Sequence, residues 1–428
     1  MIDMFYIEDY NLHWRRGFRY NFPMKRKVFE VLKRHIDSKF ITILYGQRRT
    51  GKTTLFKQLI DFLIESGVKR YDVFYYSFDE GRGSIREVIR EYEGRTGGSL
   101  TEGRKYIFLD EVQKLENWSS DVKYFYDFYP GLKIFLSGSS SLFIRRGSRE
   151  SLAGRSIEIK LGTLEFGEFL MFKGLDGLLE DVDYHREALK FEFENFLKRP
   201  YVEIVNSAEE EIGSYVSSLL DKVIYVDIPE IFPVDEPPLL ARLMAIISSR
   251  PGIYLEIQEI AKELGRSRVT ISNYLSYLNE SLLIHKVYSY SPNLLTSEKK
   301  KKRFYPASTA FCYRYTPGSI EISTLVETSF VLQLDARFFF RDPLQREVDI
   351  ISERLIPIEI KYKDTMVPRD LRGIFAFMRK NNVGRGLLIT RDVEKMEIIN
   401  DKKIYFLPAW KYALRGEKLL REVKRSGQ

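Results

Sequence analysis

Two hydrophobic patterns run through this chain, one typical of buried strands and the other of amphipathic helices. In the first 165 residues, short β-branched and aromatic runs alternate with helical spacing, as in TLFKQLIDFLIES at 54–66. The strand-like runs are ITILY at 41–45, KRYDVFYYSFDE at 69–80, KYIFLD at 105–110 and LKIFLSG at 132–138. Strands that alternate with helices favour a parallel sheet covered by helices. We therefore expect residues 1–165 to form an α/β core with an N-terminal arm.

Three further segments follow, each with its own pattern. Residues 166–235 are mostly charged with helical spacing and end at the proline-rich PEIFPVDEPP, which predicts a helical lid on the core. Residues 236–292 show a helix, the short helix IQEIAKEL, the turn GRS, the helix RVTISNYLSYL and a strand pair in LLIHKVYSY. That order predicts a winged helix-turn-helix. Residues 293–428 mix helical and strand patterns, and we expect a separate α/β domain there.

Composition and charge narrow the class of protein. The 428 residues are 44% hydrophobic and 30% charged, which is ordinary for a globular protein of two to four domains. The net charge of +8 makes DNA or another polyanion a reasonable partner, although a solvated basic surface explains it equally well. A single cysteine, Cys312, an opening without a signal pattern and the lack of a bilayer-length apolar run favour a cytoplasmic protein without membrane contact.

The clearest chemical motif is GQRRTGKTT at 46–54, which matches the phosphate-binding loop G-x-x-x-x-G-K-T. The loop lies between a predicted strand and a predicted helix, so backbone N–H groups and the helix N-terminus would face the phosphates of ATP. Lys52 would contact the β- and γ-phosphates, and the Thr53 hydroxyl would bind magnesium. The predicted nucleotide-binding residues are Gly46, Gln47, Arg48, Arg49, Thr50, Gly51, Lys52, Thr53 and Thr54.

Acidic and hydroxylic residues follow the next predicted strands. Asp110 and Glu111 end the strand KYIFLD, where we expect Asp110 to hold magnesium and Glu111 to polarise the attacking water. Ser137, at the end of LKIFLSG, either binds the γ-phosphate or water or belongs to a turn that caps the next helix. In the N-terminal arm, Trp14 and its neighbouring aromatic residues either stack on the adenine or simply pack.

An arginine is also expected to neutralise charge that develops on the transferred phosphoryl group. The segment RRGSRESLAGRS contains Arg145, Arg146, Arg149 and Arg155. We predict Arg155, because it follows a small turn just before a strand. If it acts on a neighbouring subunit, the protein is a homo-oligomer.

Together, GQRRTGKTT, IFLDEVQ followed by Trp118, SGSSS, and SLAGR before LGTLEFGEFL resemble the AAA-type ATPases of archaea and bacteria that carry a winged helix and a C-terminal nuclease-like domain. The resemblance implies a P-loop core with an additional strand in the sheet. It also implies that Glu111 is the catalytic glutamate and Arg155 the sensing or finger arginine. The segment FLKRPYVEIVN lacks the Gly-Gly-Phe-Pro turn often found in the lid of these proteins.

The predicted winged helix exposes polar residues at the start of its second helix. Val269, Ile271, Tyr274, Leu275 and Leu278 form its predicted core stripe. Arg266, Ser267, Arg268, Thr270 and Asn273 are left exposed, where major-groove contacts are usually made. Winged helices also serve as structural connectors. The basic run from Lys299 to Arg303 either follows a phosphate backbone or is a solvated loop.

The last segment carries a second chemical pattern. The helix STLVETSFVLQLDA, the strands RFFFRD, QREVDIIS and RLIPIEIKYK, the helix DLRGIFAFMRKNN and the strand GRGLLIT resemble the PD-(D/E)xK nuclease core. Asp349 and Glu359 would bind Mg²⁺ or Mn²⁺, with Glu327 completing the metal site. Lys361 would position the attacking water or stabilise the phosphate charge. Such folds also persist as binding modules without activity.

The sequence therefore predicts an ATP-hydrolysing protein that acts on DNA, with possible metal-dependent nuclease activity in the C-terminal domain. The alternative is a nucleotide-switch regulator that binds a protein partner and carries a non-catalytic nuclease-like domain.

Overall fold

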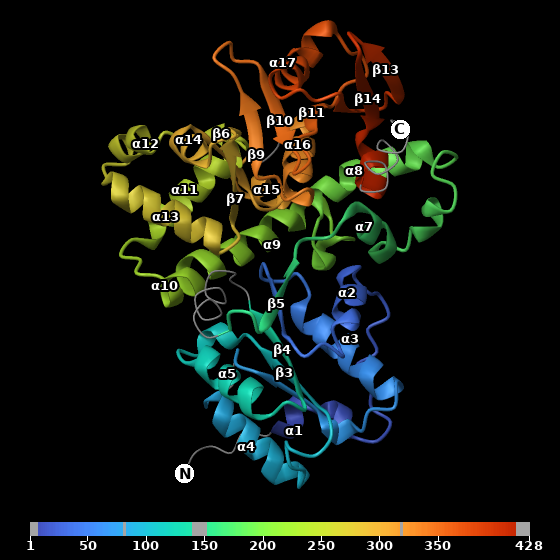
Figure 1. The fold of residues 1–428 in the computed structure, drawn as a ribbon, viewed down its shortest axis with the longest axis vertical. Helices are drawn as coiled ribbons and strands as arrows, with labels where there is room; N and C mark the ends of the chain where they lie inside the picture. The colour runs from blue at the N-terminus through green and yellow to red at the C-terminus, as the bar shows by residue number, and fades with distance from the viewer. Residues whose placement is uncertain (1–6, 80–82, 139–151, 317–319, 417–428) are drawn as a thin grey trace. The chain divides into compact units, whose positions relative to one another are not determined.

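The computed structural model describes residues 7–79, 83–138, 152–316 and 320–416 (Figure 1). The chain divides into two compact units. The first unit consists of Met1–Thr163 and Glu280–Leu282, and the second of Leu164–Asn279 and Leu283–Gln428. The end of the first unit lies close to the predicted end of the core at residue 165.

The first unit contains the predicted parallel sheet. Its strands are β1 (Ile41–Gly46), β2 (Val73–Ser77), β3 (Lys105–Asp110), β4 (Leu132–Gly138) and β5 (Ser156–Leu161). They pair in the order β2-β3-β4-β1-β5, with every pair parallel. The strands β1, β3 and β4 are buried along their whole length, as their continuous apolar runs indicate. Because β4 lies between β1 and β3, the expected additional strand is present.

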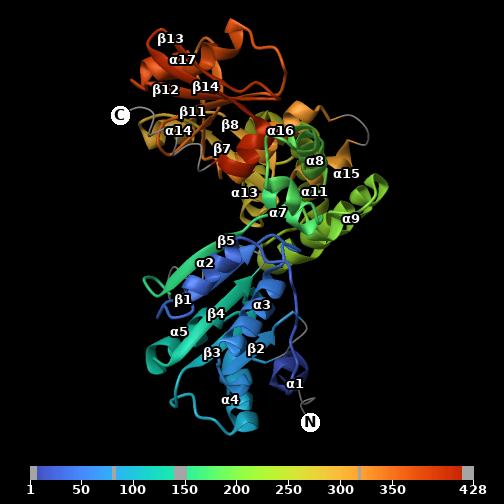
Figure 2. The same ribbon diagram turned by 90° about the vertical axis from the view of Figure 1, so that its right-hand side faces the viewer.

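Helices cover both faces of this sheet (Figure 2). One core forms under α2 (Val28–Arg34) and α3 (Lys52–Glu65), and the other under α4 (Ile85–Thr96) and α5 (Trp118–Phe128). The arm adds α1 (Ile7–Tyr10) and the 3-10 turn η1 (Leu12–Trp14). The Trp14 ring stacks on Phe74 and Tyr92 inside the second of these cores, so it packs as a core residue.

A nine-stranded mixed sheet forms the centre of the second unit, in the order β13-β14-β12-β11-β10-β9-β7-β8-β6. Its strands are β6 (Ile253–Tyr254), β7 (Ile284–Ser289), β8 (Lys302–Pro306), β9 (Phe338–Arg341), β10 (Glu347–Ile351), β11 (Pro357–Lys361), β12 (Arg385–Thr390), β13 (Lys395–Ile399) and β14 (Lys402–Pro408). The parallel pairing of β7 with β9 aligns Ser289 with Phe339. This pairing joins strands from the predicted winged helix and the predicted C-terminal domain into one sheet, which the sequence did not indicate.

Residues 166–235 are helical in the structure, as predicted. The helices of the second unit are α7 (Phe166–Phe172), α8 (Arg186–Lys198), α9 (Glu209–Lys222), α10 (Ile228–Ile231), α11 (Pro237–Ser249), α12 (Ile257–Glu263), α13 (Arg268–Glu280), α14 (Leu294–Lys299), α15 (Cys312–Tyr315), α16 (Ile322–Gln333) and α17 (Arg372–Lys380). The expected strand pair in LLIHKVYSY is wrong, because this segment forms only β7, which pairs with β8 beyond α14. Val269 was expected in the core and is instead 67% exposed.

The helices α7 and α8 share one hydrophobic core with the C-terminal strands. Phe166 and Phe169 from α7 and Phe193 from α8 belong to the same buried cluster as Ile358 and Leu387 of the sheet. The helices predicted as a lid are therefore part of the hydrophobic interior of the second unit.

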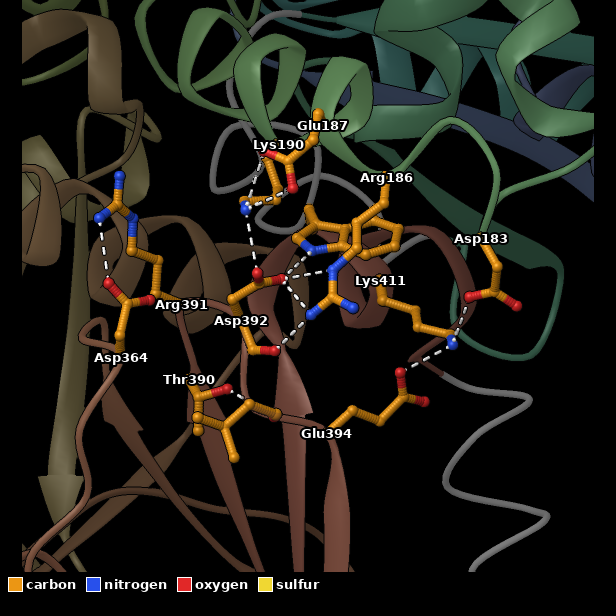
Figure 3. A network of polar contacts seen from close by, with 12 residues as sticks. Asp183, Arg186, Glu187, Lys190, Asp364, Thr390, Arg391, Asp392, Glu394 and Lys411 are labelled. Atoms are coloured by element: carbon orange, nitrogen blue, oxygen red, sulfur yellow. Dashed lines mark hydrogen bonds and ion pairs between the residues drawn. The ribbon is translucent and has the colours of Figure 1, made fainter.

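A network of charged side chains also holds α8 to the sheet (Figure 3). Asp392, in the turn after β12, accepts hydrogen bonds from Arg186 at 2.9 Å and Lys190 at 2.9 Å. Burial opposes ionisation of Asp392, but these hydrogen bonds outweigh it and lower the pKa of the carboxyl group. Lys411 makes a similar bridge between Asp183 and Glu394.

We predict that Asp392→Ala lowers the stability of the second unit by about 1 to 2 kcal/mol at pH 7, because two cations on α8 lose their shared partner. A carboxyl group with a lowered pKa stabilises the fold above its unfolded value of about 3.9, so the difference should shrink as the pH falls below 4. The measurement is hydrogen exchange of the α8 amides, which should become faster. Glu187→Ala is the matched control, since Glu187 contacts the same Lys190 but is mostly exposed. Equal effects of the two variants would contradict the prediction.

Candidate functional sites

The loop between β1 and α3 has the geometry of a phosphate-binding loop. Gly51 precedes α3 with φ at +94° and ψ at 23°, a left-handed conformation that glycine adopts at little cost. Gly46 is required for a different reason, because a Cβ atom there would collide with the Leu161 carbonyl of β5. Thr50 tightens the loop by donating its hydroxyl hydrogen to the Gln47 carbonyl at 2.8 Å. The backbone therefore reaches the N-terminus of α3 through a turn that larger residues at Gly46 would prevent.

Lys52 and Thr53 lie on the first turn of α3 and point to the end of the sheet. The Lys52 ammonium group donates to the carbonyls of Gly46 at 3.2 Å and Gln47 at 2.9 Å and lies 4.0 Å from Glu111. The Thr53 hydroxyl donates to Asp110 at 2.5 Å. A hydroxyl and a carboxylate side by side are oxygen ligands that magnesium accepts, so the residues fit the predicted metal. Thr54 follows on the same helical turn.

Asp110 and Glu111 differ in their surroundings although they are adjacent. Asp110 is almost fully buried and accepts hydrogen bonds from Thr53 and from the Ser137 hydroxyl of β4. Glu111 has φ at +55°, which turns its side chain toward Lys52 and the amide of Gln113. Three predicted residues, Asp110, Glu111 and Ser137, are thus brought together with the loop.

Two residues at this site were missed by the sequence analysis. Tyr75 of β2 donates its hydroxyl hydrogen to Asp110 at 3.0 Å, and burial together with the Asp110 charge raises its pKa. Arg26, before α2, donates to the Thr50 carbonyl at 3.1 Å and the Thr163 carbonyl at 2.8 Å. Tyr75 lies on the strand next to β3, so a prediction of strand order would have identified it. No local pattern marks Arg26.

The structure corrects the expectation for Arg155 within its own chain. Ile41 and Gly46 of β1 pair with Ser156 and Leu161 of β5, so Arg155 lies beside the start of β1 and the phosphate loop follows its end. Five residues of strand separate the two by about 16 Å. Its guanidinium group pairs with Asp127 at 3.0 Å instead. A role on a neighbouring subunit stays a prediction, and Arg145, Arg146 and Arg149 lie outside the described residues.

The second site forms in the second unit from four predicted residues. Glu327 comes from α16, Asp349 from β10, and Glu359 and Lys361 from β11. Lys361 donates to Glu359 at 2.5 Å, and the backbone N–H of Ile360 donates to Asp349 at 2.9 Å. We call these four residues the acid–lysine cluster. The helix α17 packs closely over β10, where a Cβ on Gly373 would collide with the Glu347 carbonyl.

Arg303 and Tyr305 of β8 complete this site. The Arg303 guanidinium group contacts Glu327 at 2.5 Å and Asp349 at 3.3 Å, and the Tyr305 hydroxyl donates to Glu327 at 2.7 Å. Both proposed roles for Arg303, a phosphate contact or a solvated loop residue, are therefore wrong. The alternation of Arg303 and Tyr305 along a strand is the signal that places both on one face.

Burial and mutual repulsion raise the pKa values of two carboxyl groups in the cluster. Burial raises the pKa of Glu359 well above its usual value, with a further contribution from Asp349, and the pKa of Glu327 is raised for the same two reasons. The Glu359 Oε2 atom is buried without a hydrogen-bond partner. In the described parts of the chain, no three acidic, histidine or cysteine side chains lie in an arrangement that would hold a metal. The orphaned oxygen fits a metal at Glu359, whereas Arg303 already compensates Glu327 and Asp349.

The predicted DNA-contacting residues lie at the start of α13. Arg266 is held by Glu236 through contacts of 2.7 and 2.9 Å, and Ser267 caps the helix by accepting the Thr270 N–H at 3.0 Å. Arg268 and Asn273 are exposed. Thr270 is half-buried.

Comparison with known families finds matches to three parts of the chain. Residues 38–170 match the AAA domain. This part of the chain is similar to AAA domains, and the matched range includes the loop, Asp110, Glu111 and Ser137. Residues 201–314 and 323–412 match two domains of unknown function, DUF8612 and DUF4143. The acid–lysine cluster lies in the second of them, and Arg303 and Tyr305 lie in the first.

Similar proteins occur in archaea and bacteria. The uncharacterized protein MJ1544 of Methanocaldococcus jannaschii is 25% identical over 419 residues, which cover 91% of this chain and 92% of that protein. MJ1637 of the same organism is 26% identical, with coverage of 67% and 66%. An uncharacterized protein of Haemophilus influenzae is 25% identical, with coverage of 59% and 64%.

Matches to solved structures are weaker. The ORC2 protein of Aeropyrum pernix in its ADP form gives a TM-score of 0.36 at 12% identity, covering 76% of this chain and 98% of that one. The replication initiator DnaA bound to AMPPCP and single-stranded DNA gives 0.30 at 18% identity, covering 61% and 89%. At these scores the matches carry no argument about function. Among the described residues, no helix has the length and apolar character needed to cross a membrane.

We predict opposite stability effects for two isosteric changes in the acid–lysine cluster. Glu359→Gln should leave stability unchanged or raise it, because it removes a buried, incompletely paired carboxylate. Asp349→Asn should cost about 1 to 3 kcal/mol, because its amide group must face either Arg303 or the Ile360 N–H, both of which are donors. Urea denaturation at pH 7 with a chelator measures both. A loss in Glu359→Gln as large as that in Asp349→Asn would contradict this account.

Proposed function

We propose that this protein hydrolyses ATP with magnesium at the loop between β1 and α3. The contact between Thr53 and Asp110 carries the proposal, since these two side chains would bind magnesium close to Lys52, whose amine would bind phosphate. Lys52 would exchange the carbonyls of Gly46 and Gln47 for phosphate oxygens. Glu111, oriented by Gln113, would position the attacking water, and magnesium would neutralise charge on the phosphates.

We also propose that the protein acts on DNA through the segment from α11 to β8. The order α11, β6, α12, α13, β7, α14 and β8 supports this proposal, because it resembles that of a winged helix apart from α14 between the last two strands. The strands β6, β8 and β7 pair antiparallel. Arg268 and Asn273 at the start of α13 suit guanine and adenine edges. The basic balance of the chain supports a polyanionic partner.

For the acid–lysine cluster, we propose a metal-dependent phosphodiesterase activity. The observation that supports it is the convergence of Asp349, Glu359 and Lys361 at neighbouring strands, with the orphaned Glu359 oxygen. Asp349 and Glu359 would hold Mg²⁺ or Mn²⁺, and the metal would activate water and polarise the phosphate. Lys361 would stabilise the charge that develops on the phosphate.

One observation favours a second candidate, a nucleotide-switch regulator with a non-catalytic nuclease-like domain. Arg303 pairs with both Glu327 and Asp349, so a cation from the chain itself compensates two of the three expected metal ligands. In that case hydrolysis at the AAA domain would time the binding of a protein partner.

We expect Lys52→Ala to lower ATP hydrolysis at least about 100-fold, because the amine that compensates the phosphate charge is lost. Lys57→Ala, one turn and a half further along α3, is the matched control and should retain the activity. Phosphate release with magnesium, with and without DNA, is the measurement. A rate unaffected by Lys52→Ala would contradict the assignment of this site, and a rate indifferent to DNA would count against action on DNA.

Cleavage of labelled single-stranded, duplex and branched DNA with Mg²⁺ or Mn²⁺ separates the two candidates. We expect cutting by the unmodified protein and a loss of at least about 100-fold in Glu359→Ala. Glu353→Ala, an exposed acid in the turn between β10 and β11, should still cut. Lys52→Ala in the presence of ATP shows whether hydrolysis drives cleavage. If the unmodified protein cuts no substrate, the switch regulator is the better proposal.

A further inference from the structure

A pocket of about 350 Å³ lies in the second unit between the connection from β7 to β8 and the turn from β9 to β10. It is lined by Tyr254, Ser289, Lys300, Lys301, Phe339 and Arg341, together with residues of the turn at 342–345. This volume exceeds that of a single small ion and suits part of a larger ligand. Neither the AAA domain nor the acid–lysine cluster accounts for it.

The strand register places the pocket on the same face of the sheet as Arg303. Tyr254 pairs with Arg303 and Ser289 pairs with Phe339, and paired residues share a face. Arg341 is two residues after Phe339 and therefore lies on that face as well. A row of side chains thus runs across β6, β8, β7 and β9 from the pocket to Arg303, which contacts the acid–lysine cluster.

Tyr254 connects the pocket to that cluster. Its ring lies 4.8 Å from the Arg341 guanidinium carbon and 5.7 Å from that of Arg303. Its hydroxyl group donates to Glu347 at 2.9 Å, which fixes the ring. A ligand held in the pocket is therefore separated from Arg303, and hence from Asp349, by little more than this ring.

The charges that line the pocket are unequally compensated. Arg341 pairs with Glu347 at 2.9 Å, and Lys301 pairs with Glu256. The carboxylate of Asp342, which also lines the pocket, pairs with Arg346. The Lys300 ammonium group contacts only the Tyr290 carbonyl, at 3.4 Å, and has no carboxylate partner in the described part of the chain. Burial and the nearby charge of Lys380 lower the pKa of Lys300. An anion in the pocket would favour the charged ammonium group and so oppose the lowering of this pKa.

We propose that this pocket binds a backbone phosphate of a nucleic-acid strand, beside the acid–lysine cluster. Lys300 supplies the compensating charge, and Arg341 supplies a guanidinium group that can hold two phosphate oxygens at once. The identity of the ligand as nucleic acid rests on the proposed action on DNA. The pocket itself rests on the lining residues and on the uncompensated Lys300.

Lys300→Gln tests the proposal, with Lys299→Gln as the matched control. Lys299 is exposed at the end of α14 and does not line the pocket, but its substitution changes the charge by the same amount. Binding of a labelled single-stranded oligonucleotide and of the same sequence as a duplex is measured with a chelator at several salt concentrations. We expect Lys300→Gln to weaken binding about 5- to 10-fold and to lower the slope of log Kd against log salt by about 1. Arg341→Gln should weaken binding similarly, and Lys299→Gln should change it less than about twofold.

A second readout uses the unmodified protein. Acetylation of Lys300, followed by mass spectrometry, should slow when the oligonucleotide is added, whereas acetylation of Lys299 should not. Equal protection by sodium phosphate at the same concentration would overturn the assignment to nucleic acid.

The outcomes separate this proposal from the proposed function. If the protein binds DNA and the Lys300 and Lys299 variants behave alike, the pocket proposal is overturned while action on DNA stands. If the unmodified protein binds neither oligonucleotide, the pocket proposal and the proposed action on DNA are both overturned. The proposed ATP hydrolysis is tested separately by Lys52→Ala.

Discussion

The buried contact of Arg303 with Glu327 and Asp349 is the interaction on which the organisation of the second unit depends. It joins three segments, β8, α16 and β10, that are separated along the chain. Removing one partner of a buried ion pair leaves an uncompensated charge and typically costs about 3 to 5 kcal/mol, so these segments are constrained to stay together. The same contact explains why strands from the predicted winged helix continue into the sheet of the predicted nuclease-like domain. Any shift of β8 would move the Arg303 guanidinium group away from Glu327 and Asp349 and change how their charges are compensated.

The elements with strong local patterns could be predicted from the sequence. The apolar runs of β1, β3 and β4 and the glycines of the phosphate loop define both the first sheet and the residues around Asp110. In the second unit, Asp349, Glu359 and Lys361 were found because they lie on two strands that are adjacent in sequence. In the first unit, Thr53 and Asp110 converge although β4 lies between β1 and β3, because the carboxyl ends of parallel strands meet at one edge of the sheet.

The incorrect and missing predictions concern residues whose position depends on pairing between strands that are far apart in the sequence. In the sequence, Arg303 follows a run of lysines and looks like one more surface cation. The pairing of β8 with β6 and β7 shows that its side chain is buried, whereas the lysines before it are not. Arg155 precedes a strand, but a parallel strand begins at the end of the sheet opposite the phosphate loop. The sequence of α7 and α8 does not predict that Phe166 and Phe193 share a core with Ile358. Hydrophobic periodicity shows which face of a helix is buried, but not which element covers that face.

The two candidate sites differ in how a buried cation of the chain is compensated before any ligand binds. At the phosphate loop, Lys52 donates to backbone carbonyls, which are neutral and can be exchanged for phosphate oxygens, and its ammonium group lies 4.0 Å from Glu111. In the acid–lysine cluster, Arg303 carries a full charge and faces two carboxylates, so a divalent metal competes with a cation that is already hydrogen-bonded. Binding at the first site therefore needs little rearrangement, whereas metal binding at the second needs Arg303 to give up at least the contact with Asp349.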